Sequence, residues 1–198
     1  MSMPPPLRVD VLINGGGPIG ALLATLLGRA GVRVAVVEAA PPEALARPGT
    51  DARAIAIAYT ARKVIAAAGA WEGMKAEAGE ILEIRVTDDG SPLFLHYDHQ
   101  DVGDDPLGWI VPNPAIRREL LGALAATPPA TLLAPARLRR LERLPHRVEA
   151  ELEDGRIIHA ALAVAADGRG SVLRDQAGIR VTRRDYRESG IVCIMAHE

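Results

Sequence analysis

Glycines around Pro18 form the stretch with the clearest chemical potential in the sequence, INGGGPIGAL at positions 13–22. Three of them, Gly15, Gly17 and Gly20, have the spacing Gly-x-Gly-x-x-Gly. In a turn from a strand into a helix, the first glycine permits a sharp bend and the second lets a pyrophosphate approach backbone N–H groups. The third allows the helix to pack closely on the strand. The pattern predicts a phosphate cradle.

One acidic residue, Glu38, completes this pattern. It directly follows the apolar run VRVAVV at 32–37. A carboxylate at that position accepts hydrogen bonds from the ribose hydroxyls of an adenosine. The alternative is a strand–turn–helix unit with no ligand and a solvent-facing glutamate. We expect a dinucleotide whose pyrophosphate lies over residues 15–20 and whose ribose lies on Glu38.

Local patterns place these residues at one edge of a parallel sheet. The apolar runs at 9–13 and 32–37 predict short buried strands. Residues 19–29 predict a helix, with Pro18 in its first turn and Gly31 just past its end. Strand, helix and strand in this order form a βαβ unit with parallel strands. Such a unit accepts either NAD or FAD, so the turn alone leaves the cofactor open.

The rest of the chain mixes helices with antiparallel strands. We expect a loop and then an alanine-rich helix that ends near Gly69, followed by a hairpin of the runs ILEIRV and PLFLHYD. Asn113 is expected to be the N-cap of a helix that starts at Pro114. A second hairpin is expected around Asp154 and Gly155. These elements predict an α/β fold, Rossmann-like, with an inserted antiparallel sheet.

Composition narrows the class of protein. The chain has 198 residues, of which 48% are hydrophobic and 24% charged, as in ordinary globular proteins. A net charge of −2 argues against a nucleic-acid partner. The single cysteine excludes an internal disulfide, and the five histidines show no ligand spacing, so we expect no metal site. No apolar run reaches the length of a membrane span, and the proline-rich leader is unlike a signal peptide. We expect a cytoplasmic protein, soluble or peripherally attached.

A second motif, ADGRGSVLR at 166–174, selects the cofactor. On its own, DGRGS is typical of a hairpin turn. Together with the glycine turn and Glu38, it resembles the flavin-dependent aromatic hydroxylases of the para-hydroxybenzoate hydroxylase type. In that family a strand ends in Asp-Gly, matched here by Asp167 and Gly168, and a serine and an arginine follow. The resemblance implies that Asp167 and Gly168 lie near the FAD pyrophosphate and the path of NAD(P)H.

Three further stretches resemble the hydroxylases of ubiquinone biosynthesis. They are TDARAIAIAYTARKVIAAAGAW at 50–71, WIVPNPAIRREL at 109–120 and RRDYRESGIVCIMAHE at 183–198. The resemblance covers residues 10–198 and implies an FAD-dependent monooxygenase that hydroxylates a phenol with a polyprenyl tail. Its co-substrates would be NAD(P)H and O₂. A prenylated substrate implies peripheral contact with the inner membrane.

The same resemblance assigns further cofactor-binding residues. Arg53 would face the FAD phosphates or the edge of the flavin, and Asn113 and Arg117 would approach FAD from the helix that they open. Each has an alternative: Arg53 as an ion-pair partner of Asp51, and Asn113 as a helix cap only. Because Arg117 and Arg118 are adjacent, at most one of them faces the site. No catalytic residue is assigned.

Length is the main departure from the family. The hydroxylases are considerably longer, and their second FAD motif, a Gly-Asp, lies in the later half. We therefore expect a truncated Rossmann-like FAD/NAD(P)-binding fold carrying part of the antiparallel sheet of a substrate domain. The expected ranges are an FAD-binding βαβ core at 8–80, a substrate-sheet insert at 81–106, the remainder of the FAD-binding domain at 107–180 and a first substrate-domain strand at 181–198.

Truncation also affects the expected properties. It would leave apolar surface exposed, through which the chain associates. Two rival functions remain open at this point. An NAD-dependent dehydrogenase would use the same glycine turn but has no reason to carry ADGRGSVLR. A non-catalytic module would retain the flavoprotein fold without its chemistry.

Overall fold

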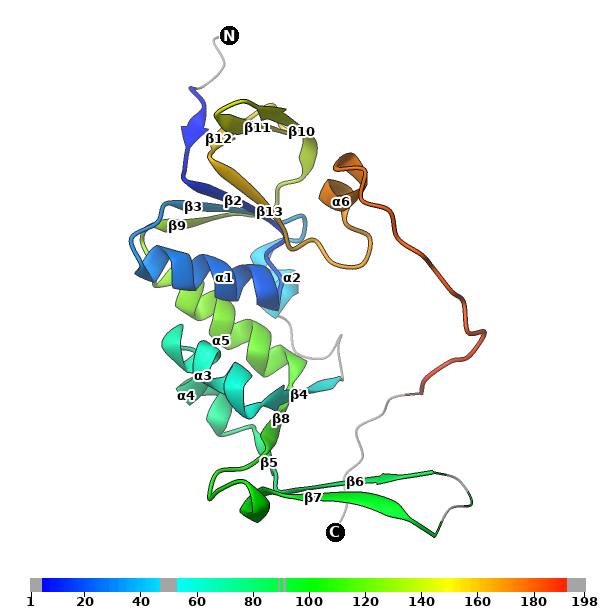
Figure 1. Ribbon diagram of the computed structural model, residues 1–198. Coiled ribbons are helices and arrows are strands. Elements are labelled where there is room, and N and C mark those ends of the chain that lie inside the picture. Colours follow the sequence, from blue (N-terminus) through cyan, green and yellow to red (C-terminus); the bar gives the residue numbers. More distant parts are fainter. Residues whose placement is uncertain (1–4, 47–52, 89, 91, 192–198) are drawn as a thin grey trace.

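A computed structural model describes residues 5–46, 53–88, 90 and 92–191, and its main body has three layers (Figure 1). The first layer is an antiparallel sheet with one parallel edge strand, in the order β1 (Leu7–Arg8), β12 (Ile157–Ala160), β11 (Arg147–Leu152), β10 (Leu138–Leu144). The second is a parallel sheet in the order β13 (Leu162–Ala165), β2 (Val11–Asn14), β3 (Val34–Val37), β9 (Ala130–Leu133). The third consists of α1 (Pro18–Arg29) and α5 (Asn113–Ala125).

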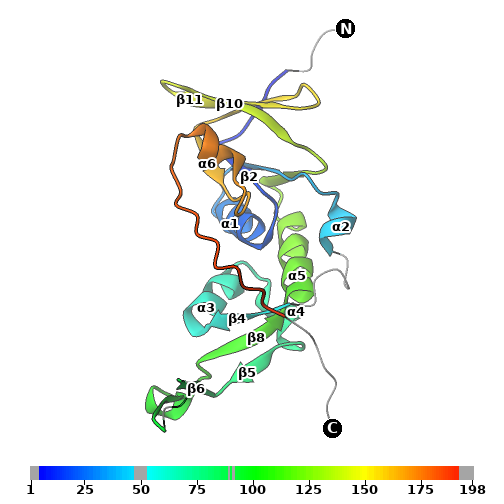
Figure 2. The same ribbon diagram turned by 90° about the vertical axis from the view of Figure 1, so that its right-hand side faces the viewer.

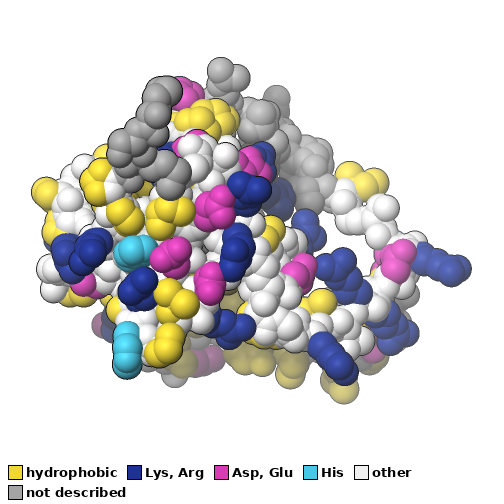
Figure 3. Space-filling view, turned by 90° about the horizontal axis from the view of Figure 1, so that it is seen from above, with side chains coloured by type: hydrophobic (Ala, Val, Ile, Leu, Met, Phe, Trp, Pro, Cys, Tyr) yellow, Lys and Arg dark blue, Asp and Glu magenta, His cyan; other side chains and the backbone are white. Residues whose placement is uncertain are grey.

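Alternating side chains explain why the parallel sheet is the middle layer. One core cluster, on the side of α1 and α5, contains Val11, Ile13, Val34 and Val36. The other, on the side of the antiparallel sheet, contains Leu12, Ala35 and Val37. Parallel strands with both faces covered are near-continuous runs of apolar residues, as β2 and β3 are. The outer face of the antiparallel sheet carries interspersed charges instead (Figure 3), including the ion pair of Arg139 with Glu151.

The predicted βαβ unit is confirmed. β2, α1 and β3 follow one another, and β2 pairs with β3 in parallel. Pro18 is the first residue of α1, where its missing N–H leaves no hydrogen bond unmade. Gly31 follows the helix with a φ of 82°, a conformation that favours glycine. In the same sheet Asn14 pairs with Ala165, so the carboxyl ends of β2 and β13 lie at one edge.

A second group of elements extends from the helix layer to the far end of the molecule (Figures 1 and 2). It contains β4 (Ala54–Ala58), α3 (Tyr59–Ala67), α4 (Trp71–Lys75), β5 (Gly79–Ile81), β6 (Glu83–Thr87), β7 (Phe94–Asp98), the 3-10 helix η1 (His99–Asp101) and β8 (Gly108–Pro112). β8 lies between β4 and β5, and β6 pairs only with β7 among the described strands. Two short helices, α2 (Pro42–Ala46) and α6 (Val172–Gln176), flank the parallel sheet.

Most local predictions are confirmed, and two are wrong. Both hairpins form, β6–β7 and β11–β12, and the alanine-rich helix ends before Gly69. Residues 54–58, in a segment for which only a loop and a helix were predicted, form β4, because pairing with β8 buries Ile57. Asn113 is not the N-cap of α5 but its first residue, after the extended Pro112. The N–H of Asn113 continues the β4–β8 ladder by donating to the carbonyl oxygen of Arg53 at 2.9 Å.

The C-terminal segment bears on one predicted strand. Residues 179–191 follow α6 along the side of the molecule without regular secondary structure (Figure 2). The described part of the strand expected at 181–198 is therefore not a strand, and residues 192–198 lie outside the described part of the chain. The other domain ranges stay predictions. Within the described ranges no helix is long and apolar enough to cross a membrane.

Candidate functional site

Two of the three motif glycines are fixed by the packing of the turn itself. Gly15 has a φ of 108°, and a Cβ there would overlap the carbonyl oxygen of Ala166. A Cβ on Gly20 would overlap the carbonyl oxygen of Gly15. The N–H of Gly15 also donates to the carbonyl oxygen of Val37 at 2.8 Å. The turn needs both glycines whether or not a ligand binds.

Gly17 differs from its neighbours. A Cβ there would meet no atom within 4 Å, and its φ of −64° suits any residue. Gly17 is the N-cap of α1 and borders a cavity of about 150 Å³, whose other wall includes Arg117 and Leu121 of α5. The first N–H groups of a helix have no partner within the helix, and its dipole favours negative charge there. This corner can hold an anionic group, and Gly17 leaves space for one.

Glu38 is held beside the turn. Its Oε2 accepts a hydrogen bond from the N–H of Gly16 at 2.7 Å, and its Oε1 accepts one from the N–H of Ala40 at 2.8 Å. Each carboxylate oxygen keeps capacity for a further donor such as a hydroxyl. The half-buried side chain borders a second cavity of about 240 Å³, which Asp167 also borders. Glu38 is therefore a fixed acceptor at the sheet edge.

Asp167 occupies the edge position expected of it. Its Oδ2 accepts hydrogen bonds from the Asn14 side chain at 3.0 Å and from the N–H of Val172 at 2.8 Å. Partial burial alone raises the pKa of this carboxyl, but the hydrogen bonds, first that of Ser171, outweigh burial and lower the pKa below its usual value. Asp167 thus stays ionised and joins the ends of β2 and β13 to α6.

The arginines of α5 divide as expected. Arg117 borders the cavity at Gly17, whereas Arg118 forms ion pairs of 2.8 Å with Glu77 and with Glu119. Only one of the two adjacent residues therefore faces the glycine turn.

The remaining predicted residues lie less centrally. Asn113 is buried, at the start of α5. Arg53 is exposed at the start of β4 and borders neither cavity in the described structure, and Asp51 lies outside the described residues. Gly168, with a φ of 79°, follows Asp167 on the exposed surface. The structure thus brings Gly17, Glu38, Arg117 and Asp167 to one edge, whereas Arg53 lines neither cavity.

Two contributors were not predicted from the sequence. Asn14, whose role the sequence left open, orients Asp167. The segment after β9 borders the Glu38 cavity through Ala136 and Arg137, and the N–H of Ala136 donates to the carbonyl oxygen of Glu38 at 2.7 Å. No local motif marks this segment, because only the pairing of β9 with β3 brings it there.

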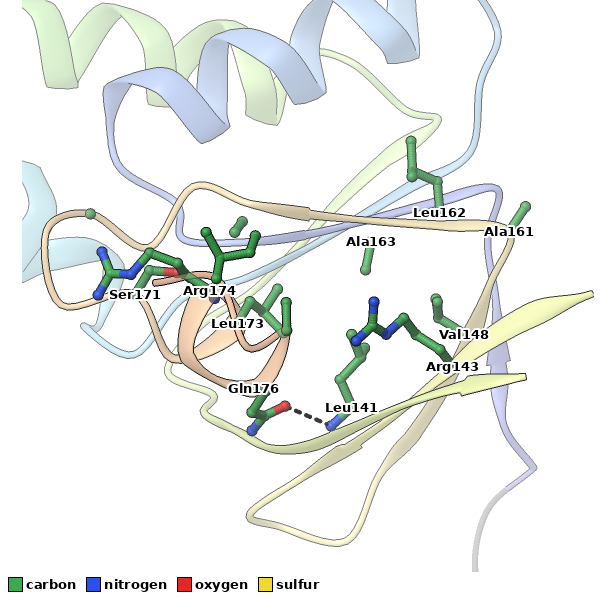
Figure 4. A pocket seen from close by; sticks show the side chains of 14 residues that line it. Leu141, Arg143, Val148, Ala161, Leu162, Ala163, Ser171, Leu173, Arg174 and Gln176 are labelled. Carbon is green, nitrogen blue, oxygen red and sulfur yellow. Dashed lines mark hydrogen bonds between the residues drawn. The ribbon is translucent and has the colours of Figure 1, made fainter. Parts of the chain in front are cut away.

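A larger, mostly apolar cavity of about 530 Å³ lies on the other side of β13 (Figure 4). Leu162 of β13, Leu173 of α6 and Leu141 of β10 border it. Gln176 closes one end, its Oε1 accepting the N–H of Leu141 at 3.2 Å. The outer edge of β13 pairs with no strand in the part of the chain that the structure describes. Gly168 and Ser171 of the second motif also border this cavity, but the residues of the glycine turn and Glu38 do not.

Comparison with known proteins agrees with this geometry. Residues 8–198 match the family described as FAD binding domain. The ubiquinone hydroxylase UbiL of Rhodospirillum rubrum is 43% identical over 189 residues, which are 96% of this chain and 44% of that protein. The 3-demethoxyubiquinol 3-hydroxylase of Escherichia coli is 32% identical, over 91% of this chain and 46% of that protein. PqsL, a probable FAD-dependent monooxygenase from Pseudomonas aeruginosa, aligns with a TM-score of 0.74 and 31% identity, over 90% of this chain and 48% of that one. The chain spans less than half the length of these relatives.

Proposed function

The chain belongs to the FAD-binding domain family, and from this premise we propose that it is the FAD-binding part of a hydroxylase of ubiquinone biosynthesis. The expected family, the Rossmann-like fold and FAD as cofactor are confirmed by the same comparisons. The proposed substrate is a prenylated phenol, with NAD(P)H and O₂ as co-substrates. Two similar proteins are named for ubiquinone or ubiquinol hydroxylation, which supports this choice over an NAD-dependent dehydrogenase.

The proposed binding mode assigns a role to each residue of the corner. The FAD pyrophosphate lies over Gly16 and Gly17 at the N-terminus of α1, where Arg117 adds a positive charge, and the adenosine ribose donates to Glu38. When bound, FAD supplies the redox chemistry, and the protein positions it. The observation that carries this proposal is Gly17: the fold closes space around Gly15 and Gly20 but leaves it open there. Arg53, Asn113, Asp167 and Gly168 are proposed to line the cofactor further along.

Replacing Gly17 by valine tests this binding mode directly. The added Cβ meets no atom of the protein, but the valine side chain occupies the space proposed for the phosphates. ADP and FAD should therefore bind roughly ten-fold more weakly or worse, a loss of about 1.4 kcal/mol in binding free energy. Gly122→Val on α5 is the matched control, because a Cβ added at Gly122 also meets no atom within 4 Å. Isothermal titration with ADP and with FAD measures both variants. Unchanged affinity in a folded Gly17→Val protein would rule out the proposed site.

A second variant probes the ribose contact. Glu38→Ala removes the acceptor and should weaken ADP binding by about 1–3 kcal/mol. Because the chain spans less than half of its relatives, we also propose that it holds FAD weakly and has no hydroxylase activity alone. Stoichiometric FAD in the purified chain, together with NAD(P)H oxidation that depends on a prenylphenol, contradicts this. If the full-length protein binds FAD but shows no such turnover, a non-catalytic role is favoured.

We further propose that the chain associates with itself and with membrane surfaces. One face of the β6–β7 hairpin presents Ile84, Val86, Leu95 and Tyr97, each between 42% and 60% exposed. The outer edge of β13 adds free backbone hydrogen-bonding groups. Apolar surface and unpaired strand edges favour association. Sedimentation equilibrium tests self-association, and co-sedimentation with anionic vesicles tests membrane binding. A chain that stays monomeric and does not bind the vesicles contradicts both proposals.

A further inference from the structure

The polar face of the β6–β7 hairpin gathers metal-ligating side chains far from the glycine turn (Figure 1). The antiparallel register pairs Glu83 with Asp98 and Arg85 with His96. Because strand residues two positions apart share a face, all four side chains project from the same side. One ligand atom from each of Glu83, His96 and Asp98 lies within 4.8 Å of the other two.

This arrangement places two acidic residues directly opposite each other. Like charges at paired positions of an antiparallel ladder repel. Nitrogen atoms border Glu83, since its Oε2 lies 3.2 Å from Nε2 of His96 and 3.1 Å from the Arg85 guanidinium. The Arg85 side chain is mostly exposed and forms a surface pair of little energetic value, so it can leave Glu83 at small cost. A divalent cation between the carboxylates offsets their repulsion more completely.

The donor set favours a divalent cation that accepts both nitrogen and oxygen ligands, such as Zn²⁺. Imidazole nitrogens and carboxylate oxygens both occur as Zn²⁺ ligands, and a site with three protein ligands keeps a fourth position for water. Asp98 is held by outer partners, because its Oδ1 accepts the N–H of Gln100 at 2.9 Å and lies 3.1 Å from Nδ1 of His99. Hydrogen bonds of this kind orient metal ligands in known sites.

We propose that Glu83, His96 and Asp98 bind one Zn²⁺ ion that fastens the two strands of the hairpin. A two-stranded hairpin without further cover is marginally stable, and this one has both faces exposed. The expectation of no metal site rested on histidine spacing along the chain. The three ligands here come together only through the register of the hairpin.

Titration of the untagged, chelator-treated chain with Zn²⁺ tests this proposal. We expect one Zn²⁺ per chain by calorimetry, an affinity lowered roughly ten-fold or more by His96→Ala and by Glu83→Gln, and slower amide exchange at 83–98 on adding Zn²⁺. His159→Ala is the matched control, because His159 forms a similar cross-strand contact with Glu149 at 3.0 Å, but among the described residues no second carboxylate is grouped with them.

Three results overturn the proposal. They are the absence of Zn²⁺ binding, an affinity unchanged in both hairpin variants, and an equal loss in the His159→Ala control. Each would leave the cluster as an ion-pair network only. None bears on the FAD site, because the titration needs no flavin and the hairpin lies away from the glycine turn.

Discussion

The glycine-turn edge of the parallel sheet and the β6–β7 hairpin are both built from adjacent strands, but other elements cover only the first. At the edge, β2 and β3 are covered on both faces, and the Asp167 carboxylate is held by Asn14 and by α6. On the hairpin, Val86 and its apolar neighbours are about half exposed, and so are the charges of the opposite face. The polar groups of the edge are therefore held by hydrogen bonds within the protein itself.

This difference bears on where binding energy comes from. A preformed edge holds its acceptors and N–H groups in place, so a ligand there loses little ordering energy. The hairpin has both faces exposed, so its own contacts stabilise it little, and a cation on its polar face or further protein on its apolar face would add stability. The same substitution should therefore cost more stability at the sheet edge than on the hairpin.

The largest effect is expected from Gly20→Ala. The new Cβ would overlap the carbonyl oxygen of Gly15, and neither backbone segment can move without breaking the turn. We expect a loss of about 3 kcal/mol in the free energy of unfolding. Gly122→Ala, also inside a helix but in open space, should instead gain up to about 1 kcal/mol. Urea unfolding followed by circular dichroism measures both, and equal stability of the two variants would mean that the turn adapts.

A second effect compares one substitution in the two regions. Val36→Thr buries a hydroxyl in the core and should cost about 2 kcal/mol, since Val36 is fully buried. Val86→Thr makes the same change on the hairpin, where the hydroxyl stays solvated, and should cost less than about 0.5 kcal/mol. It should also reduce self-association. If Val86→Thr proved as costly as Val36→Thr, the hairpin face would be covered in solution.

These two regions also show which features a sequence predicts. The glycine turn, Pro18 in the first turn of α1 and the existence of the β6–β7 hairpin are set by neighbours along the chain, and all three are as expected. β4 was missed because its partner β8 lies about fifty residues later, and an Ala/Ile alternation also suits a helix. The expected cap at Asn113 was displaced by the same distant pairing.

Site residues follow the same division. Gly17 and Glu38 were predicted because the motif and the strand end are local signals. The contact of Asn14 with Asp167 joins residues 153 positions apart, and the Zn²⁺ ligands depend on a cross-strand register. The role of Arg53 in cofactor binding remains a prediction, because Arg53 borders neither of the two cavities beside the glycine turn.

A third, intermediate effect concerns Asp167→Asn. The amide accepts weaker hydrogen bonds from Asn14 and Val172 than the carboxylate does, so a loss of about 1–2 kcal/mol is expected at neutral pH. Because the folded-state pKa of Asp167 is lowered, its stabilisation is present above the ordinary pKa of about 3.9 and is lost as the pH falls through the folded value. Unfolding curves of both proteins should converge toward acidic pH. A difference that is constant with pH would exclude a role for the charge.

The smallest effect is expected from Arg85→Gln on the hairpin, measured without Zn²⁺. Arg85 and Glu83 form an ion pair of 3.1 Å, but their side chains are 64% and 48% exposed. Water screens such a pair, and holding two long side chains in place costs entropy, so the loss should stay below about 0.5 kcal/mol. Added salt should remove even this difference. Asp167 has partners of a different kind, since the Asn14 side chain and a backbone N–H group of α6 hold it without any long side chain. A loss from Arg85→Gln equal to that from Asp167→Asn, and insensitive to salt, would show that the hairpin is as well ordered as the sheet edge.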